Sequence, residues 1–279
     1  MKIESATNLY CIFGNPVRQS LSPVIHNALF DHYNLNSVYL AFNPEDIKDA
    51  VDSVRTLNIK GASITIPFKI EVMKNIDNIS IEAERIGSVN TLVNSDGLIK
   101  GYNTDGYGIL QPLKELGIIL KGKKIIIIGN GGSARSTAFS LLENESDIII
   151  SGRSDEKIKA LAADLNKIKN SADSINLKHL DKTFMKSIDI IINTTPIGMT
   201  PDNISTPIDT SLLNDKHIIF DIVYKPDKTK LLLDAESKGC TVIKGINMLI
   251  YQAMKQFELW TGIIPDPAVI YKALELNKL

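Results

Sequence analysis

The run of residues 123–142, KKIIIIGNGGSARSTAFSLL, constrains the fold of this chain more than any other stretch. Its four consecutive isoleucines, at 125–128, form a short β-branched apolar run, which is typical of a parallel strand buried on both faces. Three glycines follow within the next four positions, and residues 133–142 then carry apolar side chains at helical spacing. The order of strand, glycine-rich turn and helix predicts part of a doubly wound α/β sheet.

Gly129, Gly131 and Ala134 fit the G-x-G-x-x-G/A fingerprint of dinucleotide-binding sites. The first glycine makes a tight turn, the second lets the backbone approach a pyrophosphate, and the small third residue lets helix and strand pack closely. A pyrophosphate would bind the N–H groups at the positive end of the helix. A strand, turn and helix without a ligand is the alternative interpretation of such a motif taken alone.

The end of the next expected strand, at residues 147–151, favours NADP over NAD. Sites that prefer NAD usually place Asp or Glu there to hold the ribose hydroxyls. Here Gly152, Arg153 and Ser154 follow the strand, with Lys157 shortly after, so a guanidinium is present where a 2′-phosphate would need one. The two acidic residues in between fall at the start of the next expected helix, and we interpret them as charges that favour its N-terminus.

Composition narrows the class of protein. A chain of 279 residues with 44% hydrophobic and 23% charged residues is long enough for two globular domains, and its net charge of −1 gives no support for nucleic acid or an acidic membrane as a partner. Cys11 and Cys240 each lie in an apolar run, so we expect buried free thiols in a reducing cytoplasm. We see no signal peptide, no membrane span and no metal-binding motif, and we expect a cytoplasmic protein without a metal.

The residues before the glycine-rich motif predict a separate α/β domain. Strands and helices alternate there in a β-α-β-α-β pattern, which implies a mostly parallel sheet with right-handed crossovers. Ser22 before Pro23 predicts a helix start with the serine as N-cap, and residues 94–97 (NSDG) predict a hairpin turn. The expected strands are 9–14, 38–42, 62–66, 88–93 and 98–101, and the longer helices are 22–33 and 44–57.

We place the domain boundary at residues 103–105. The second domain then continues through alternating strands and helices, and the chain ends in a strong amphipathic helix at 247–260 and a last helix from about residue 267. The strands expected after the glycine-rich unit are 147–151, 174–180, 188–193, 218–223 and 241–243.

Polar side chains at strand ends are candidates for ligand binding, because open α/β sheets bind ligands beyond the carboxyl ends of their strands. The candidates are Ser20, Ser22, Lys69, Asn90, Thr91, Asp105, Tyr224 and Gln252. A lysine and an aspartate that face one cleft would form a proton-transfer couple, in which the carboxylate orients the ammonium. Each residue also has a structural interpretation: Ser22 as an N-cap, Asp105 as a turn residue and Lys69 as a solvated charge.

In this order, the motifs of the chain resemble those of the shikimate dehydrogenase family, which includes quinate/shikimate dehydrogenases. The match covers essentially the whole chain, and that order is more specific than any single motif. The matching segments are GNPV (14–17), SLSP (20–23), HN (26–27), GASITIPFK (61–69), IGSVNTL (86–92), GYNTD (101–105), GNGGSA (129–134), GRS (152–154), NTTPIGM (193–199), DIVYKP (221–226) and GINMLIYQ (245–252).

The resemblance implies a two-domain α/β chain. Residues 1–103, rejoined by helices at 246–279, would form the substrate-binding domain, and residues 104–245 a Rossmann-like NADP-binding domain. The family reduces 3-dehydroshikimate to shikimate with NADPH, a step in chorismate and aromatic amino-acid biosynthesis. The small-molecule substrate and the cofactor are the expected partners, and the protein is expected to be a monomer or a homodimer.

The resemblance also assigns roles to residues. It implies that Lys69 and Asp105 form the catalytic pair, which handles the hydroxyl proton. The substrate-binding residues that it implies are Ser20, Ser22, Ser63, Thr65, Asn90, Tyr224 and Gln252. The cofactor-binding residues that it implies are Gly129, Asn130, Gly131, Gly132, Ser133, Ala134, Gly152, Arg153, Ser154, Lys157, Ile222 and Gly245.

The chain departs from the usual motifs at three positions. Gln19 replaces a histidine, Ser63 replaces an asparagine, and Gly152 stands in the usual N-R-T motif. Two alternatives stay open: a quinate/shikimate dehydrogenase of dual specificity that uses NAD, and a catalytically silent, ligand-sensing relative. Arg153 argues against the first alternative, and the intact pair of Lys69 and Asp105 argues against the second.

Overall fold

The protein, described by a computed structural model over residues 3–276, divides into two compact units. The first unit is formed by Met1–Thr104 together with Ile250–Leu279, and the second by Asp105–Leu249. Each contains one sheet covered by helices, so the predicted α/β class is confirmed. Helix α9 (Gly245–Thr261) begins in the second unit and ends in the first.

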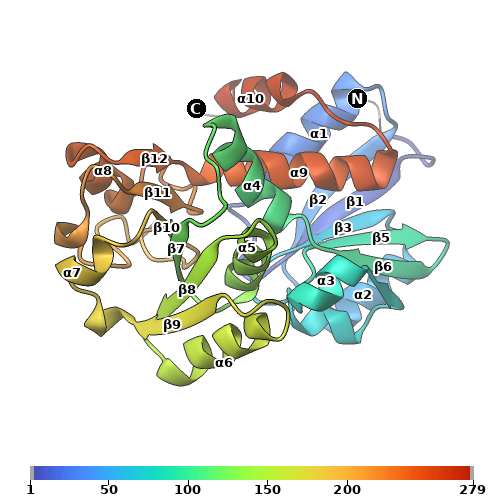
Figure 1. Ribbon diagram of the computed structural model, residues 1–279. Coiled ribbons are helices and arrows are strands. Elements are labelled where there is room, and N and C mark those ends of the chain that lie inside the picture. The colour runs from blue at the N-terminus through green and yellow to red at the C-terminus, as the bar shows by residue number, and fades with distance from the viewer. Residues whose placement is uncertain (1–2, 277–279) are drawn as a thin grey trace. The chain divides into compact units, whose positions relative to one another are not determined.

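The first unit is built on a six-stranded sheet. Its strands are β1 (Asn8–Phe13), β2 (Ser37–Phe42), β3 (Gly61–Ile64), β4 (Asn78–Ile79), β5 (Thr91–Ser95) and β6 (Leu98–Tyr102), in the order β2-β1-β3-β5-β6-β4 (Figure 1). β1 pairs in parallel with β2 and β3, and β4 with β6, whereas β5 pairs antiparallel with β3 and β6. The β5–β6 turn has φ of 52° at Asp96 and 93° at Gly97, which is the predicted hairpin turn.

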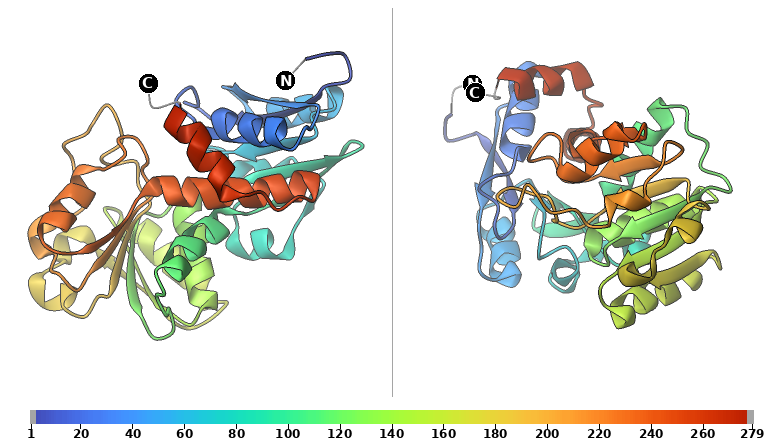
Figure 2. Two further views of the ribbon diagram at one scale, coloured as in Figure 1. Left: turned by 90° about the horizontal axis from the view of Figure 1, so that it is seen from above. Right: turned by 90° about the vertical axis from the view of Figure 1, so that its left-hand side faces the viewer.

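Helices cover both faces of this sheet. They are α1 (Ser22–His32), α2 (Ile47–Thr56), the 3-10 turn η1 (Glu71–Lys74), α3 (Ile81–Ile86), the end of α9 and α10 (Pro267–Leu276). Successive side chains of a strand point to opposite faces. Cys11 and Phe13 of β1 therefore pack with α2, η1 and α3, whereas Tyr10 contacts the rings of Phe30 in α1 and Trp260 in α9. α10 contacts α1, and the views in Figures 1 and 2 show these two helices side by side.

Trp260 attaches the C-terminal half of α9 to the sheet. Its indole N–H donates to the carbonyl of Leu92 at 2.9 Å. A Cβ at Gly61 would lie 2.3 Å from the same indole nitrogen, so only a glycine in β3 lets the ring pack this closely. The amide side chains of α9 are thereby held over β3 and β5.

The second unit has a fully parallel sheet. Its strands are β7 (Lys124–Ile128), β8 (Asp147–Gly152), β9 (Ala172–Asn176), β10 (Ile190–Asn193), β11 (Ile218–Asp221) and β12 (Thr241–Ile243). Their spatial order, β12-β11-β10-β7-β8-β9, is that of a doubly wound dinucleotide-binding sheet, with the switch point between β7 and β10. The Rossmann-like fold predicted from the glycine-rich motif is therefore confirmed.

Helices lie on both faces of the second sheet. They are α4 (Asp105–Glu115), α5 (Gly132–Glu143), α6 (Asp155–Asn166), α7 (Lys182–Met185) and α8 (Lys230–Ser237), with short 3-10 turns η2 (Leu177–His179) and η3 (Thr210–Leu212). Ile126 and Ile128 of β7 pack in one core with α7 and α8. Ile125 and Ile127 point the other way and are equally buried, as the sequence predicts for a central strand.

Two local predictions are wrong. Ser22 is not the N-cap of α1, because the N–H of Ile25 donates to the carbonyl of Leu21, which makes Leu21 the cap and places Ser22 in the first turn. The strand predicted at 174–180 ends at Asn176, because the Asn176 side chain accepts from the N–H of Lys178 and starts η2. In both places a local hydrogen bond sets the boundary.

Both cysteines, Cys11 and Cys240, are free and buried. Within residues 3–276, no helix has the length and apolar character required to cross a bilayer.

A buried carboxylate orders two loops at the carboxyl edge of the second sheet. Asp221, at the end of β11, accepts from the Nδ2 of Asn193 at 2.9 Å, the hydroxyl of Thr229 at 2.6 Å and the N–H of Val223 at 3.1 Å. Asn193, its register partner on β10, accepts from the backbone N–H and the hydroxyl of Thr195 at 3.0 and 2.7 Å. The two side chains thus hold the loops that follow β10 and β11, at the edge where a sheet of this type binds its ligand.

Asp221 generates a pH prediction. Burial raises its pKa to about 6, and hydrogen bonds from Thr229, Val223 and Asn193 oppose that rise. The pKa of Asp221 in the unfolded chain is about 3.9. The protonated carboxyl group is therefore favoured in the folded state, and the stability that it contributes is present below about pH 4 and is lost as pH rises through 6. We expect the free energy of unfolding of Asp221→Asn, minus that of the parent, to increase by about 2 kcal/mol from pH 4 to pH 7 in urea titrations.

Asp234→Asn is the matched control. Lys230 lowers the pKa of Asp234, so this carboxylate stabilises the fold above its unfolded pKa and loses that contribution as pH falls. The difference between Asp234→Asn and the parent should therefore change in the opposite direction. A difference for Asp221→Asn that stays constant with pH would contradict the prediction.

Candidate active site

The turn after β7 packs against the loop that follows β10. Gly129 has a φ of 129°, a conformation that residues with a Cβ rarely adopt. A Cβ there would also lie 2.4 Å from the hydroxyl oxygen of Thr194. That hydroxyl donates to the carbonyl of Ile128 at 2.7 Å, which fixes the loop onto the end of β7. The first glycine of the fingerprint is thus required by both backbone conformation and space.

The N-terminus of α5 is open. Gly131 is its N-cap, and among the described residues no side chain caps this end. A Cβ built on Gly131 would have no atom within 4 Å, so the space in front of this residue is not filled by the second unit itself. Gly132, Ser133 and Ala134 form the first turn, and Ala134 is buried against the sheet. An open helix N-terminus with backbone N–H donors is suited to a phosphate group.

The end of β8 presents a cation. Gly152 ends the strand, and a Cβ there would lie 2.9 Å from Ile158 and 3.8 Å from the Asn130 amide, so Asn130 lies beside this strand end. The exposed Arg153 follows directly. Ser154 is the N-cap of α6, and its hydroxyl accepts from the N–H of Lys157 at 3.5 Å.

Asp155 is a helix N-terminal charge, as predicted. It opens α6 and accepts from the Nδ2 of Asn176 at 2.7 Å, a hydrogen bond that lowers the pKa of this carboxyl group. Its position and partner differ from those of an acid that ends the second strand and holds ribose hydroxyls.

Gly245 lies against the backbone that follows β11. A Cβ on Gly245 would lie 2.4 Å from the carbonyl oxygen of Val223 and 2.5 Å from the carbonyl carbon of Ile222. Ile222 and Gly245, two predicted cofactor-binding residues, are therefore in contact, and only glycine permits this approach.

In the first unit, the segment before α1 places two serines together. The N–H of Ser22 donates to the hydroxyl of Ser20 at 3.2 Å, and Ser22 is buried while Ser20 is half-buried. The segment after β3 forms a turn in which the N–H of Phe68 donates to the carbonyl of Thr65. Lys69, which ends this turn, accepts from the N–H of Val89 through its carbonyl at 2.8 Å.

Asn90 is the centre of a buried polar cluster. Its Oδ1 accepts from the backbone N–H of Thr104 at 2.8 Å and from the hydroxyl of Thr91 at 2.7 Å. Its Nδ2 donates to the hydroxyl of Thr104 at 3.0 Å and lies 3.5 Å from the Oε1 of Gln252. The fold therefore brings together Asn90 and Gln252, which are 162 positions apart in sequence. Both are candidate substrate-binding residues from the sequence.

Gln256 belongs to the same cluster and was missed by sequence reasoning. It is 1% exposed, and its Nε2 donates to the hydroxyl of Thr91 at 3.0 Å and to the carbonyl of Asn90 at 3.2 Å. Its Oε1 accepts from the hydroxyl of Ser63 at 2.9 Å. A signal was present, because Gln256 lies four residues after Gln252 and so shares its helix face.

The predicted site residues divide between the two units. Ser20, Ser22, Ser63, Thr65, Lys69, Asn90 and Gln252 lie in the first unit. Asp105, Tyr224 and all of the predicted cofactor-binding residues lie in the second. Asp105 is nearly fully buried, opens α4 and follows Thr104 directly in the chain.

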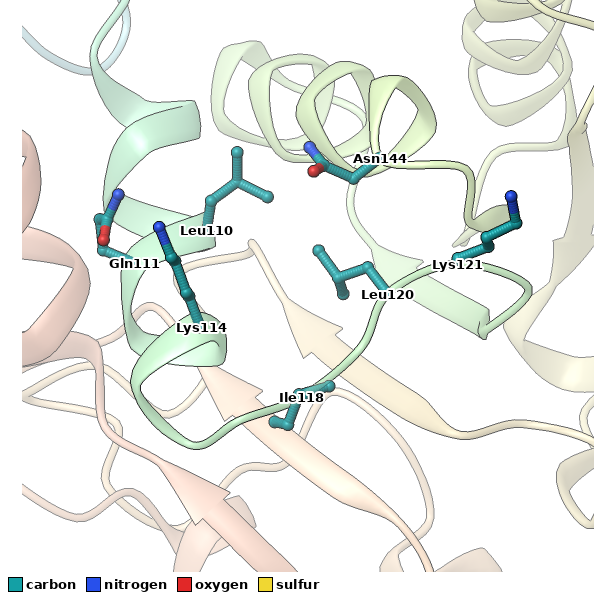
Figure 3. A pocket seen from close by; sticks show the side chains of 7 residues that line it. All are labelled: Leu110, Gln111, Lys114, Ile118, Leu120, Lys121 and Asn144. Atoms are coloured by element: carbon teal, nitrogen blue, oxygen red, sulfur yellow. The ribbon is translucent and has the colours of Figure 1, made fainter.

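A hollow of about 420 Å³ in the second unit involves none of these residues (Figure 3). It lies between α4, the segment before β7 and the end of α5, and Lys121 at its rim pairs with Glu145 at 2.7 Å. Its lining residues are Leu110, Gln111, Lys114, Ile118, Leu120, Lys121 and Asn144.

Three family models match the chain in sequence order. Residues 12–92 match the shikimate dehydrogenase substrate-binding domain, residues 113–223 match shikimate/quinate 5-dehydrogenase, and residues 245–275 match the shikimate 5′-dehydrogenase C-terminal domain. The first match covers most of the first unit, and the second covers the parallel sheet up to β11.

Individual relatives match over nearly their full length. The NADP(+) shikimate dehydrogenase of Caldanaerobacter subterraneus subsp. tengcongensis is 38% identical over 98% of this chain and 99% of its own. A crystal structure of a shikimate dehydrogenase in complex with NADP+ has a TM-score of 0.93 at 38% identity and covers 100% of this chain and 98% of its own. The quinate dehydrogenase of Corynebacterium glutamicum, in complex with NAD, has a TM-score of 0.89 at 27% identity and covers 97% and 99% of the two chains.

These matches agree with the doubly wound parallel sheet and the glycine-rich turn of the second unit. The chain belongs to the shikimate dehydrogenase family.

Proposed function

We propose that this protein catalyses the reversible, NADPH-dependent reduction of 3-dehydroshikimate to shikimate. The observation that carries the proposal is the full-length match to relatives named NADP(+) shikimate dehydrogenase, at 38% to 41% identity over at least 98% of the chain for two of them. The chain's own chemistry supports it: one unit holds buried amides and hydroxyls suited to a polyhydroxylated substrate, and the other an open helix N-terminus suited to a pyrophosphate.

We assign substrate binding to residues 1–103 with 246–279, and NADP binding to residues 104–245. When bound, NADPH supplies the hydride. The chain's part is to hold the cofactor: the backbone at Gly131 and the first turn of α5 would bind the pyrophosphate, and the Arg153 guanidinium would bind the 2′-phosphate. The Asn130 amide lies beside Gly152, and Ser154 and Lys157 follow Arg153 closely in the chain. The opposite end of the site would be lined by Ile222 and Gly245.

We propose that Lys69 and Asp105 carry the proton transfer. Reduction places negative charge on the carbonyl oxygen, and the Lys69 ammonium donates the proton that turns this oxygen into a hydroxyl. The Asp105 carboxylate orients the ammonium and balances its charge; in the oxidation direction the proton returns along the same path. Ser20 and Ser22, at the start of α1, suit the substrate carboxylate because a helix N-terminus attracts anions. Thr65, Asn90, Tyr224 and Gln252 would bind its hydroxyls.

In the cell, we propose a cytoplasmic enzyme of chorismate and aromatic amino-acid biosynthesis, acting as a monomer or a homodimer on a small-molecule substrate. The buried free cysteines and the near-neutral charge of the chain support the cytoplasmic assignment.

One alternative has a specific observation in its favour. The fold is shared with a quinate dehydrogenase solved with NAD, and Ser63 replaces the asparagine that is usual in its motif. A serine in place of the longer asparagine changes the hydrogen bonds available at this position, and dual specificity for quinate and shikimate would be the consequence. Arg153, with no acid at the end of β8, favours NADP against this alternative.

The direct test is steady-state oxidation of shikimate and of quinate, each with NADP and with NAD, followed by absorbance of the reduced nicotinamide. We expect a strong preference for shikimate with NADP. Comparable turnover of quinate, or of either substrate with NAD, would assign the protein to the dual-specificity branch. No turnover with any pair would favour a silent, ligand-sensing relative.

Lys69→Ala tests the catalytic assignment. Removal of a general acid lowers turnover about a hundredfold to ten-thousandfold, and we expect kcat with shikimate to fall within this range while the Michaelis constant for NADP stays unchanged. Lys74→Ala, which removes an exposed lysine five positions further along the chain, is the control and should leave both constants at the parent value. Turnover of Lys69→Ala near that of the parent would refute the role of Lys69.

Two substitutions in the second unit separate the parts of the cofactor site. Arg153→Ala removes the charge that pairs with a 2′-phosphate, so we expect the Michaelis constant for NADP to rise about tenfold, with little change in that for NAD. Gly131→Ala introduces a methyl group where the chain leaves space and where a pyrophosphate would approach, so both constants should rise together. Urea unfolding of Gly131→Ala should match the parent. Equal effects of Arg153→Ala on NADP and NAD would remove the argument for NADP.

A further inference from the structure

A chain of buried hydrogen bonds runs through the first unit from β2 to Asn90. It starts at Tyr39, which is fully buried and donates its hydroxyl proton to the hydroxyl oxygen of Ser63 at 2.6 Å. Ser63 donates in turn to the Oε1 of Gln256 at 2.9 Å. The connection joins β2, β3 and α9, which lie far apart in the sequence.

The second half of the chain leads to Asn90. The Nε2 of Gln256 donates to the hydroxyl oxygen of Thr91, and the Thr91 hydroxyl donates to the Oδ1 of Asn90 at 2.7 Å. The same Nε2 donates to the backbone carbonyl of Asn90 at 3.2 Å. The Asn90 side chain is therefore bonded at its carbonyl oxygen, and its amide nitrogen is turned toward Thr104 and Gln252.

The sense of this chain determines which way each amide faces. A hydroxyl has one proton to donate, and the Ser63 proton goes to Gln256, so Tyr39 must be the donor to Ser63. The oxygen of the Gln256 amide is then bonded to Ser63, which leaves its nitrogen for Thr91. The Thr91 hydroxyl then donates to the Oδ1 of Asn90, which also accepts from the backbone N–H of Thr104. A reversed amide at Asn90 would place its Nδ2 against the N–H of Thr104, donor against donor.

Tyr39 itself is held rigidly. The Asn27 side chain donates to the carbonyl of Tyr39 at 2.9 Å and accepts from its N–H at 2.8 Å. The ring of His26 stacks on the Tyr39 ring with 4.5 Å between centroids and 24° between planes. Burial lowers the pKa of His26 to about 3, and the neighbouring Gln256 amide only partly opposes this, so the stacked ring is neutral at physiological pH. The chain of hydrogen bonds therefore begins from a fixed group.

Ser63 uses its hydrogen-bonding capacity inside this chain. It is 4% exposed, accepts from Tyr39 and donates to Gln256. The family resemblance implies that Ser63 contacts the substrate, but its only proton is already committed to Gln256. A short side chain at this position leaves room for the Gln256 amide to reach Ser63 and Thr91 together.

We propose that Gln256, held by Tyr39 and Ser63, is a positioning residue that fixes the side-chain amide of Asn90 for the substrate. The proposal rests on the proposed function, because it assigns the orientation of a substrate-binding amide. It gives Ser63 an indirect role, through Gln256.

Two substitutions interrupt the chain at different points. Gln256→Met keeps the volume of the side chain but removes both its donor and its acceptor, and Tyr39→Phe removes one oxygen atom. We expect each to raise the Michaelis constant for shikimate about tenfold, the effect of losing one oriented hydrogen bond. The Michaelis constant for NADP should stay at the parent value, because these residues lie in the substrate unit. If Gln256→Met fails to fold, Tyr39→Phe, which removes only one atom, carries the test.

Asn94→Ala is the matched control. Asn94 is buried on β5, and its amide bonds the carbonyls of Val54 and Ile59 rather than the chain that ends at Asn90. It should lower the midpoint of urea unfolding, as the other variants do, but leave the Michaelis constant for shikimate unchanged. A purely structural role of Gln256 would make Gln256→Met behave like Asn94→Ala.

The double variant Tyr39→Phe/Gln256→Met tests whether the two residues act through one path. Because the first break already removes the constraint that this chain places on Asn90, we expect the second to add less than threefold to the Michaelis constant, instead of a further tenfold. Independent, multiplying effects would overturn the proposal, as would a Michaelis constant for shikimate within twofold of the parent in both single variants. A parent protein that does not oxidise shikimate would instead refute the proposed function.

Discussion

The architecture of the second unit depends on the burial of both faces of β7. Its four isoleucines leave no side of the strand for water, so helices must cover the sheet above and below, and a parallel sheet allows this only through crossover connections. Winding in both directions from one central strand creates a switch point beside it. The open N-terminus of α5 follows from that topology, and the glycines at its edge are needed because the backbones there come closer than a Cβ allows.

The first unit is subject to a different constraint. Its candidate substrate residues are buried amides and hydroxyls, and each unsatisfied one would cost about 1–3 kcal/mol. Asn90, Thr91, Ser63 and Gln256 meet that requirement by bonding one another in a fixed sense. Side chains that bond one another in this way are ordered before a substrate binds, which lowers the entropy cost of binding. Tyr39, whose ring contacts those of His26 and Trp260, gives that network a rigid support.

The sequence alone predicted the α/β class, the doubly wound sheet, the hairpin at 94–97 and the family, because these depend on periodicity, turn residues and motif order. It assigned Asn90 and Gln252 to one substrate-binding set only through the family resemblance. It did not predict Gln256, since its partners Ser63 and Thr91 are 193 and 165 positions away and only tertiary packing brings them together. The cap of α1 at Leu21 was missed because a cap without a side-chain hydrogen bond leaves no signature in the sequence.

The first unit is assembled from two separate stretches of the chain, with Trp260 of α9 packing on β1 and β3, strands that are synthesised long before α9. Until α9 has been synthesised, a nascent chain therefore leaves exposed the part of the β1 face that Trp260 covers. The second unit is one continuous stretch, Asp105–Leu249, and has its complete parallel sheet by residue 243. We expect the dinucleotide-binding unit to fold before the substrate unit during translation, so any chain cut short before α9 exposes a sheet face that chaperones and proteases recognise.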